Sequence, residues 1–388
     1  MTKATNNTSI CAQDDIGLKM NTFYNVDSMS HDGMEKIKTK SIDLILTDLP
    51  FGTTKNKWDI IIPLNDYIEI EINNKLIQMQ YDEYLLHCYK NHIKLNIAEN
   101  DWKKLHKKGL WHSYNRILKD DGVILLFAQK PFDAMLQNSN KQDFRYEWIW
   151  EKTHPSGHMN AKKMPMKAHE NILVFYKSLP TYNPQKTSGH ERKTSTADRA
   201  KLPSTNYGKQ FSVTSYDSTE RYPRSVIKIA HDKQFLQLVP TQKPVELYEY
   251  LIRTYSNKHS IVLDHCSGSG TLAVACENVG DRNFICMEMD KDHGYFEDSV
   301  DRLNIHRILR TVVKEAIVTS STPKIKDIVK ISLADERILS LSNYRRGDEI
   351  IKRIKKNIEN IVDVYKRSEH IEIKENGCIA WMSDKTNA

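Results

Sequence analysis

The sequence lacks the features that mark membrane and secreted proteins. No apolar run approaches the roughly 20 residues that a helix needs to cross a bilayer. The polar stretch 1–16 contains no apolar segment of the kind found in a secretory signal. The six cysteines are scattered and form no C-x-x-C pair, which argues against a disulfide framework and against a zinc finger. We therefore expect no membrane association and a reducing, cytoplasmic compartment.

Strong overall charge is also absent, and the excess that exists is concentrated in one segment. The chain has 388 residues, 39% of them hydrophobic, so it can bury at least one sizeable core. Net charge is only +7, but residues 177–238 carry eleven Lys and Arg against five Asp and Glu. This segment is polar and contains tyrosines, a composition that suits a polyanion whose bases can stack. A solvated surface insertion has the same composition, so both interpretations stand at this point.

Two regions, one on each side of the basic segment, have the pattern of α/β units. In the first unit, strands are expected at 22–27, 41–47, 123–127, 144–150 and 171–176, with helical segments at 32–38 and 110–118. In the second unit, helices are expected at 244–255 and 271–278 and strands at 260–264 and 283–288. Strands separated by helices predict a doubly wound, mostly parallel sheet.

Two further segments do not fit this pattern. Residues 65–108 are weakly patterned, and we expect them to form a helical insertion. From about residue 310 the sequence no longer resembles the rest, and 348–367 has apolar residues at helical spacing. Between 345 and 367, eight Lys and Arg face four Asp and Glu. This tail is expected to be a small helical appendage whose charged face is either solvated or contacts DNA or a second copy.

A glycine turn joins the strand at 260–264 to the helix that follows it. Gly268 and Gly270 allow a sharp turn and the close approach of a ligand. Glu288 ends the next strand and can bind the two hydroxyls of a ribose. The pattern fits either a nicotinamide dinucleotide or the adenosine of S-adenosylmethionine. Asp264 favours the second, because a carboxylate there repels a pyrophosphate but suits a positively charged amino acid group.

The strand at 42–47 is followed by Asp48-Leu49-Pro50-Phe51, which is similar to the D-P-P-Y motif of DNA amino-methyltransferases. Six other segments also resemble phage- and bacterial-type members of this family, namely 52–59, 146–152, 159–163, 168–175, 222–228 and 240–245. The glycine turn and Glu288 complete the set. The resemblance extends over residues 20–305 and leaves out the 65–108 insertion and the C-terminal tail.

The resemblance implies a Rossmann-like methyltransferase fold, S-adenosylmethionine as cofactor and DNA as substrate. In this family a catalytic motif that precedes the cofactor loop marks the β-type circular permutation. The implied parts are a catalytic half at 20–176, a target-recognition region at 177–238, a cofactor-binding half at 239–308 and an appendage at 309–388. A homodimer and a cognate restriction endonuclease are candidate partners.

The tetrapeptide has a chemical rationale. The Asp48 carboxylate and the Leu49 carbonyl would accept the two N–H groups of an exocyclic amine, Pro50 would stiffen the turn, and Phe51 would stack on the flipped base. Leu49 and Phe51 depart from the family's proline and tyrosine but keep the carbonyl and the ring. Asp at the head favours adenine N6, since family enzymes acting on cytosine N4 more often begin with Ser. Cytosine N4, and a DNA-binding protein whose catalytic motif has decayed, remain the alternatives.

The resemblance also implies roles for residues outside the tetrapeptide. The candidate cofactor-binding residues are Asp27, Thr241, Lys243, Asp264, Ser267, Gly268, Gly270, Thr271 and Glu288. Asp27 is expected at the end of a strand next to that of Asp48, although a helix N-cap explains it nearly as well. The candidate DNA-binding residues are Lys162, Lys186, Arg192, Lys193 and Arg199. No metal site is expected, because His154, His158 and His169 lack a cysteine or carboxylate at ligand spacing.

Overall fold

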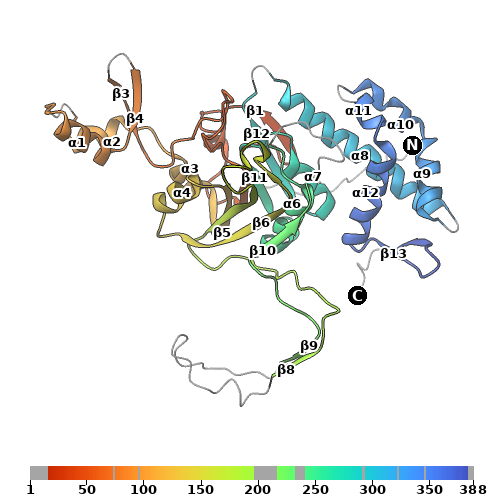
Figure 1. Ribbon diagram of the computed structural model, residues 1–388. Coiled ribbons are helices and arrows are strands. Elements are labelled where there is room, and N and C mark those ends of the chain that lie inside the picture. The colour runs from red at the N-terminus through yellow and green to blue at the C-terminus, as the bar shows by residue number, and fades with distance from the viewer. Residues whose placement is uncertain are drawn as a thin grey trace, which may run out of the picture.

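The centre of the molecule is an eight-stranded sheet. The computed structural model describes residues 16–72, 75–94, 97–195, 216–231, 241–290, 293–320, 323–344 and 347–382. Strand order in the sheet is β1-β12-β11-β2-β5-β7-β6-β10 (Figure 1). The strands are β1 Thr22–Asn25, β2 Ile42–Thr47, β5 Leu118–Ala128, β6 Phe144–Ser156, β7 Lys167–Phe175, β10 Val226–Ile229, β11 Ile261–Asp264 and β12 Asn283–Glu288.

Most neighbouring strands run in the same direction. The pairs from β1 through β12, β11 and β2 to β5 are all parallel. β7 is antiparallel to both β5 and β6, and β10 is parallel to β6. The doubly wound, mostly parallel sheet expected from the sequence is confirmed. The antiparallel exception arises because β6 and β7 are joined through η2 (His158–Asn160) and turns, with no crossover helix between them.

Helices cover both faces of the sheet, and β2 shows why. Its side chains alternate between the faces, so Leu44 and Leu46 pack in one core and Ile45 in the other. The first core includes residues of α6 (Val245–Tyr255) and α7 (Thr271–Val279). The second includes residues of η1 (Met34–Lys36), α3 (Leu110–Ile117) and α4 (Phe132–Ser139). A strand buried on both faces reads as a continuous apolar run, as this one does.

One expectation about strand neighbours was wrong. The strand that precedes Asp27 is not next to that of Asp48: β1 pairs with β12, with Asn25 opposite Glu288. Both edges of β2 are occupied, by β11 and by β5, so β1 takes the free edge of β12. The Asp27 side chain is exposed and accepts the backbone N–H of Met29 at 2.9 Å, so it closes a local turn.

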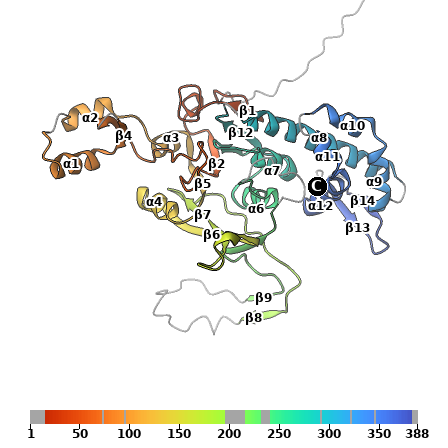
Figure 2. The ribbon, with the colours of Figure 1, turned by 45° about the horizontal axis from the view of Figure 1, so that its top comes forward.

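The sequence predicts a helical insertion at 65–108, but the structure contains strands there as well. It contains an antiparallel hairpin of β3 (Ile68–Ile72) and β4 (Lys75–Met79), followed by α1 (Tyr81–Lys90) and α2 (Glu99–Leu105). The strict alternation of Ile and Glu in β3 has the period of a strand. The insertion has a small core of its own and projects away from the sheet in both views (Figures 1 and 2).

A second projection begins beyond β7. β8 (Lys193–Ser195) pairs with β9 (Tyr216–Ser218), and the bridge between Thr187 and Arg221 continues the pairing towards the body. We call residues 183–195 and 216–222 the basic arm; it extends well away from the sheet (Figures 1 and 2). Of the expected DNA-binding residues, Arg199 lies outside the described residues.

The C-terminal part is a helical module that grows out of the sheet domain. Its elements are α8 (Tyr295–Thr319), α9 (Ile325–Leu333), α10 (Glu336–Leu339), η4 (Ser340–Asn343), α11 (Gly347–Ile351), α12 (Ile354–Arg367), β13 (Ile371–Ile373) and β14 (Ile379–Trp381). The domain boundary expected between 308 and 309 falls inside α8. Leu303 packs in the core of the sheet domain, whereas Ile305 and Leu309 pack in the core of the module, so one helix serves both.

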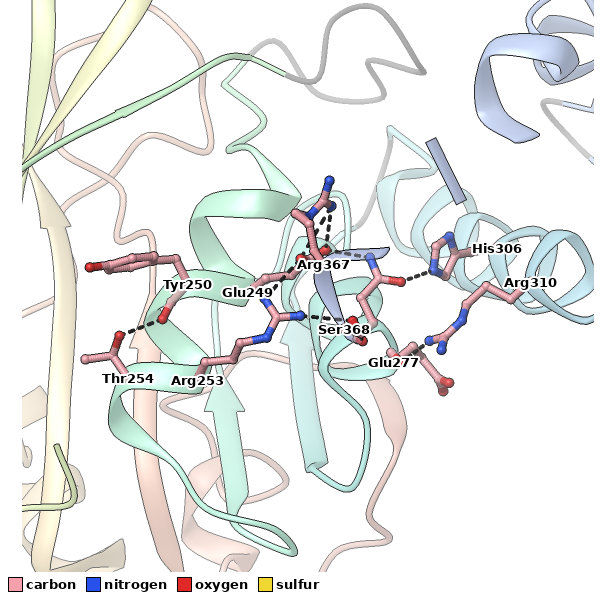
Figure 3. A network of polar contacts seen from close by, with 10 residues as sticks. Glu249, Tyr250, Arg253, Thr254, Glu277, His306, Arg310, Arg367 and Ser368 are labelled. Carbon is pink, nitrogen blue, oxygen red and sulfur yellow. Dashed lines mark hydrogen bonds and ion pairs between the residues drawn. The ribbon is translucent and has the colours of Figure 1, made fainter. Parts of the chain in front are cut away.

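A buried polar network fastens this module to the sheet domain (Figure 3). Glu249 of α6 is fully buried and accepts the amide of Asn278 at 2.8 Å, and Arg253 and Arg367 pair with its carboxylate at 3.3 Å and 3.4 Å. His306 contacts Asn278 at 2.7 Å from α8. Because a buried carboxylate needs its partners, these contacts hold α12 against α6 and α7.

Among the described residues no helix combines the length and apolarity needed to cross a membrane.

Candidate active site

A cavity of about 1280 Å³ lies at the carboxyl ends of β2, β11 and β12. This is where open α/β sheets bind their ligands, because the loops that follow parallel strands gather at one edge. Its lining includes the whole tetrapeptide Asp48, Leu49, Pro50 and Phe51, and also Asp27, Thr241, Lys243, Asp264, Ser267, Gly268, Thr271 and Glu288. Two segments more than 200 residues apart in the chain thus face one space. Gly270, the second glycine of the turn, faces the protein interior, where an added Cβ would come within 2.8 Å of the Phe23 ring.

The glycine turn is built to leave room. Gly268 and Gly270 have φ values of +48° and +71°, in the left-handed region that favours glycine. A Cβ at Gly268 would meet nothing within 4 Å, so its backbone borders open space. The backbone N–H of Gly268 donates to Glu288 at 2.7 Å, and burial raises the pKa of this carboxyl. The Ser267 hydroxyl is buried and has no hydrogen-bond partner among the described residues, so a donor and acceptor stands ready for a ligand.

Asp264 places a buried carboxyl group in the site. It accepts the Thr47 hydroxyl at 2.7 Å and the backbone N–H of Cys266 at 3.2 Å, and it is 2% exposed. Burial raises the pKa of the Asp264 carboxyl to about 7. An organic cation in the cavity would therefore find a carboxyl that gains its charge near neutral pH. The carboxylates, the open space at Gly268 and the unbonded hydroxyl of Ser267 all fit the cofactor expected from the sequence.

The tetrapeptide is held from two sides. Phe51 packs against Phe132 with ring centroids 5.4 Å apart, and Leu49 is buried in the same core. After it, the Asp59 carboxylate accepts the backbone N–H groups of Gly52, Thr53 and Thr54 at 2.7–2.9 Å. Burial acts to raise the pKa of Asp59, but the Thr54 side chain and these backbone bonds lower it overall. A loop with three anchored amides presents a rigid backbone to the cavity.

Asp48 belongs to a buried cluster of four charged side chains. Lys243 donates to one carboxylate oxygen of Asp48, and its Nζ atom lies 3.4 Å from Glu170 Oε2. Lys152 donates to the other oxygen of Glu170. Burial acts to lower the pKa of Lys243, but Asp48 and Glu170 raise it overall, which keeps the ammonium charged. Burial likewise acts to raise the pKa of Glu170, and the two lysines lower it overall.

Lys243 has a different partner from the one its predicted role implied. We expected it on the cofactor side, but its ammonium bonds the head of the tetrapeptide. Its backbone carbonyl contacts the glycine-turn side, where it accepts the Thr271 hydroxyl at 3.3 Å. Lys243 therefore links the start of α7 to Asp48.

The histidine beside the turn is structural. His265 is buried between the Tyr114 hydroxyl at 2.6 Å and the Ser28 hydroxyl at 3.2 Å. Burial lowers the pKa of His265 to about 4, so the ring is neutral at physiological pH and positions the loop. In the part of the chain that the structure describes, no group of three or more His, Cys, Asp and Glu side chains could hold a metal ion.

The candidate DNA-binding residues lie away from the glycine turn. Lys162 is exposed in the segment between β6 and β7, near the cavity-lining residues Gly157 and His158. On the basic arm, Lys186 pairs with Glu220 at 3.0 Å and Arg192 pairs with Asp217 at 2.6 Å, while Lys193 is exposed on β8. The arm projects from the sheet domain, so these side chains do not line the cavity (Figure 1).

Sequence reasoning gave no role to several residues that shape the site. Lys152 and Glu170 lie on β6 and β7 inside segments that resemble the family, and the signal that could have found them is a charged residue within a strand that is otherwise buried. Arg302 of α8 donates to the Ser269 carbonyl at 3.0 Å and steadies the turn. Nothing in the sequence pattern indicates this contact, because Arg302 lies on a later helix that is distant from the turn in the chain.

A Rossmann-like sheet whose strand ends bring an Asp-Leu-Pro-Phe turn and a glycine turn into one cavity has the features of a DNA amino-methyltransferase. A family model described as DNA methylase, for N6/N4 methyltransferases, matches residues 42–299. The chain belongs to this family. Membership supports S-adenosylmethionine as the cofactor and DNA as the substrate.

Curated relatives are type II methyltransferases. M.HpaI of Haemophilus parainfluenzae is 26% identical over 277 residues, which cover 70% of this chain and 71% of that protein. M.HindIII of Haemophilus influenzae is 23% identical over 316 residues, which cover 73% of this chain and 95% of that protein. Among solved structures, the M1.HpyAVI–SAM complex has a TM-score of 0.40 and 19% identity, covering 73% of this chain and 98% of that chain.

Proposed function

We propose that this protein transfers the methyl group of S-adenosylmethionine to the N6 amine of an adenine flipped out of DNA. The observation that carries the proposal is the shared cavity, in which Asp48 and the glycine turn face the same space. Asp48 Oδ1 is buried and has no hydrogen-bond partner among the described residues, so it is an acceptor in need of an N–H group. Adenine is favoured because the tetrapeptide begins with Asp.

The chain's own residues would act chiefly by positioning. Asp48 and the Leu49 carbonyl accept the two N–H groups of the amine, which frees its lone pair, and Phe51 offers a ring face for the base. The cofactor supplies a methyl group that its sulfonium already activates. Asp264 would hold the cofactor's ammonium, and Glu288 the ribose hydroxyls. Asp48 Oδ1 is placed to receive the proton that the methylated nitrogen releases.

Methylation of a genome by the purified protein tests this directly. Unmethylated genomic DNA would be incubated with protein and cofactor, digested to nucleosides and analysed by mass spectrometry, with sequencing to locate the modified sites. We expect N6-methyladenine at a defined sequence. N4-methylcytosine would instead support the second candidate, a cytosine-N4 methyltransferase, because the family model covers both N6 and N4 enzymes. DNA binding without methyl transfer would indicate a decayed enzyme.

Cofactor affinity should depend on the ionisation of Asp264. Below pH 7 this carboxyl is largely protonated and neutral, and above pH 7 it is ionised, so binding of a cation tightens as pH rises. We expect an about fivefold lower dissociation constant at pH 7 than at pH 6, a range in which an α-amino group stays protonated. Isothermal calorimetry of the wild type and of Asp264→Asn checks this. The variant should show a flat profile; an equally steep profile would assign the titration to another group.

The basic arm should contribute electrostatic affinity for DNA. Replacing Lys186, Arg192 and Lys193 together by glutamine is expected to lower the slope of log K against log salt by about 1 to 3, one unit for each phosphate that the variant no longer neutralises. Fluorescence anisotropy on duplex DNA across a salt series measures the slope. Lys40→Gln, which breaks an exposed pair with Asp120, is the matched control. An unchanged slope in the triple variant would place the DNA-binding surface elsewhere.

The division of the chain into functional parts, the homodimer and the cognate endonuclease remain predictions. Membership of a family with type II relatives supports a search for an endonuclease with the same recognition sequence. Residues 177–238, which include the basic arm, carry a local excess of positive charge, and this supports the placement of the target-recognition region there.

A further inference from the structure

The four charged side chains around the head of the tetrapeptide form a chain of alternating sign. Asp48 bonds Lys243, Lys243 lies beside Glu170, and Glu170 bonds Lys152. Side-chain exposures are 21% for Asp48, 12% for Glu170, 7% for Lys152 and 6% for Lys243. Two positive and two negative charges sum to zero, as expected for a buried cluster that has given up its hydration.

The charge of Lys243 opposes the chemistry assigned to Asp48. Lys243 bonds Oδ2 of the Asp48 carboxylate, which leaves Oδ1 for the amine of the base but keeps an ammonium close to it. An ammonium in that position also disfavours the positive charge that develops on the attacking nitrogen during methyl transfer, because like charges repel strongly in a buried site. Methyl transfer is therefore favoured if the ammonium moves away from Asp48 when the base binds.

Glu170 provides the place for it to go. Its Oε2 atom is buried, lies 3.4 Å from Lys243 Nζ, and accepts no hydrogen bond within the described part of the chain. A shift of about 0.5 Å would bring the ammonium to the usual hydrogen-bond distance. Lys152 holds the other oxygen and so fixes the orientation of Glu170. Glu170 Oε2 and Lys243 Nζ already form an ion pair, so the ammonium can shift towards Glu170 without losing contact with a carboxylate.

We propose that Glu170 is a positioning residue that receives the Lys243 ammonium when the amine of the target base bonds Asp48. This inference rests on the proposed function and adds a step to it: exchange of one hydrogen-bond partner within a cluster whose net charge stays zero. Lys152 keeps the receiving carboxylate in place. Since the Lys243 carbonyl accepts the Thr271 hydroxyl at the start of α7, the lysine backbone stays anchored while its side chain moves.

The proposal predicts that the charges of residues 170 and 243 act as a pair. Glu170→Gln leaves Lys243 paired with Asp48 and should lower kcat for methyl transfer by about 10- to 100-fold, the usual coupling between charged residues in contact. Cofactor affinity should change less than about twofold, because Glu170 does not contact the glycine turn. The double variant Glu170→Gln with Lys243→Gln restores neutrality and frees Asp48, so it should recover at least tenfold of the loss.

The experiment compares the wild type, both single variants and the double variant. Methyl incorporation into unmethylated genomic DNA gives kcat and KM, calorimetry gives cofactor affinity, and thermal unfolding reports folding. Glu151→Gln, on the same strand as Lys152, breaks an exposed pair with Lys228 and is the control expected to match the wild type. The proposal would be overturned if Glu170→Gln were as active as the wild type. It would also be overturned if the double variant were no more active than Glu170→Gln alone.

A second measurement does not depend on the variants. In a crystal structure of the wild type with a cofactor analogue and its target DNA, Lys243 Nζ should bond Glu170 Oε2, and the base amine should bond Asp48. An ammonium still bonded to Asp48 beside the amine would overturn the exchange. If the wild type methylates no DNA at all, the proposed function fails as well; activity in the wild type without coupling rejects only this inference.

Discussion

Asp48→Asn should reduce methyl transfer by about 100- to 1000-fold, the range seen when one preorganised polar group is removed from a catalytic site. Asparagine has nearly the same shape, but its amide carries no charge and can turn an N–H towards the base. It also removes one of the two anionic partners that Lys243 has among the described residues, the other being Glu170. The variant should therefore lose the group that accepts the amine's N–H while the cavity keeps its shape.

Single-turnover transfer of a labelled methyl group to DNA measures this loss, and calorimetry measures cofactor binding. Cofactor affinity should stay close to the wild-type value, because Asp264 and Glu288 are unchanged. Asp120→Asn, an exposed aspartate paired with Lys40, is the matched control and should behave as the wild type. Wild-type activity in Asp48→Asn would reject the chemistry assigned to the tetrapeptide.

Glu288→Ala should weaken cofactor binding by about 100-fold or more, since each hydrogen bond to a charged group contributes about 1.5–3 kcal/mol. The substitution removes the carboxylate expected to bind the ribose hydroxyls. It also removes the acceptor of the Gly268 N–H, so the turn loses one of its anchors. Both effects act on the cofactor side of the cavity.

The affinity can be measured by calorimetry with S-adenosylmethionine and with S-adenosylhomocysteine. Transfer at saturating cofactor should recover towards the wild-type rate, because the tetrapeptide and its charged cluster are untouched. Glu315→Ala, which breaks an exposed pair with Arg337 in the C-terminal module, is the control. Undiminished affinity in Glu288→Ala would show that the cofactor binds elsewhere in the cavity.

Local patterns in the sequence predicted much of the fold correctly. The apolar strands β2, β11 and β12 and the helices α6 and α7 lie close to where spacing placed them, because periodicity reports which faces a segment buries. The insertion was mistaken for helix although β3 alternates strictly, since the pattern around it is weak. The neighbour of β1 was also wrong, because strand order depends on which edges are free and no local signal records it.

By itself, the sequence determined the family, and it predicted the two turns proposed to carry the chemistry and the strands that precede them. Each of these depends on residue types at short spacing, because turns and strands form according to the local preferences of the backbone. Only the tertiary structure decided that the two turns share a cavity and that Lys243 bonds Asp48 beside Glu170 and Lys152. Those four charged residues come from separate segments of the chain, and sheet order brings them together. Because the cluster is buried, its charges must be neutralised by partners that are distant in sequence.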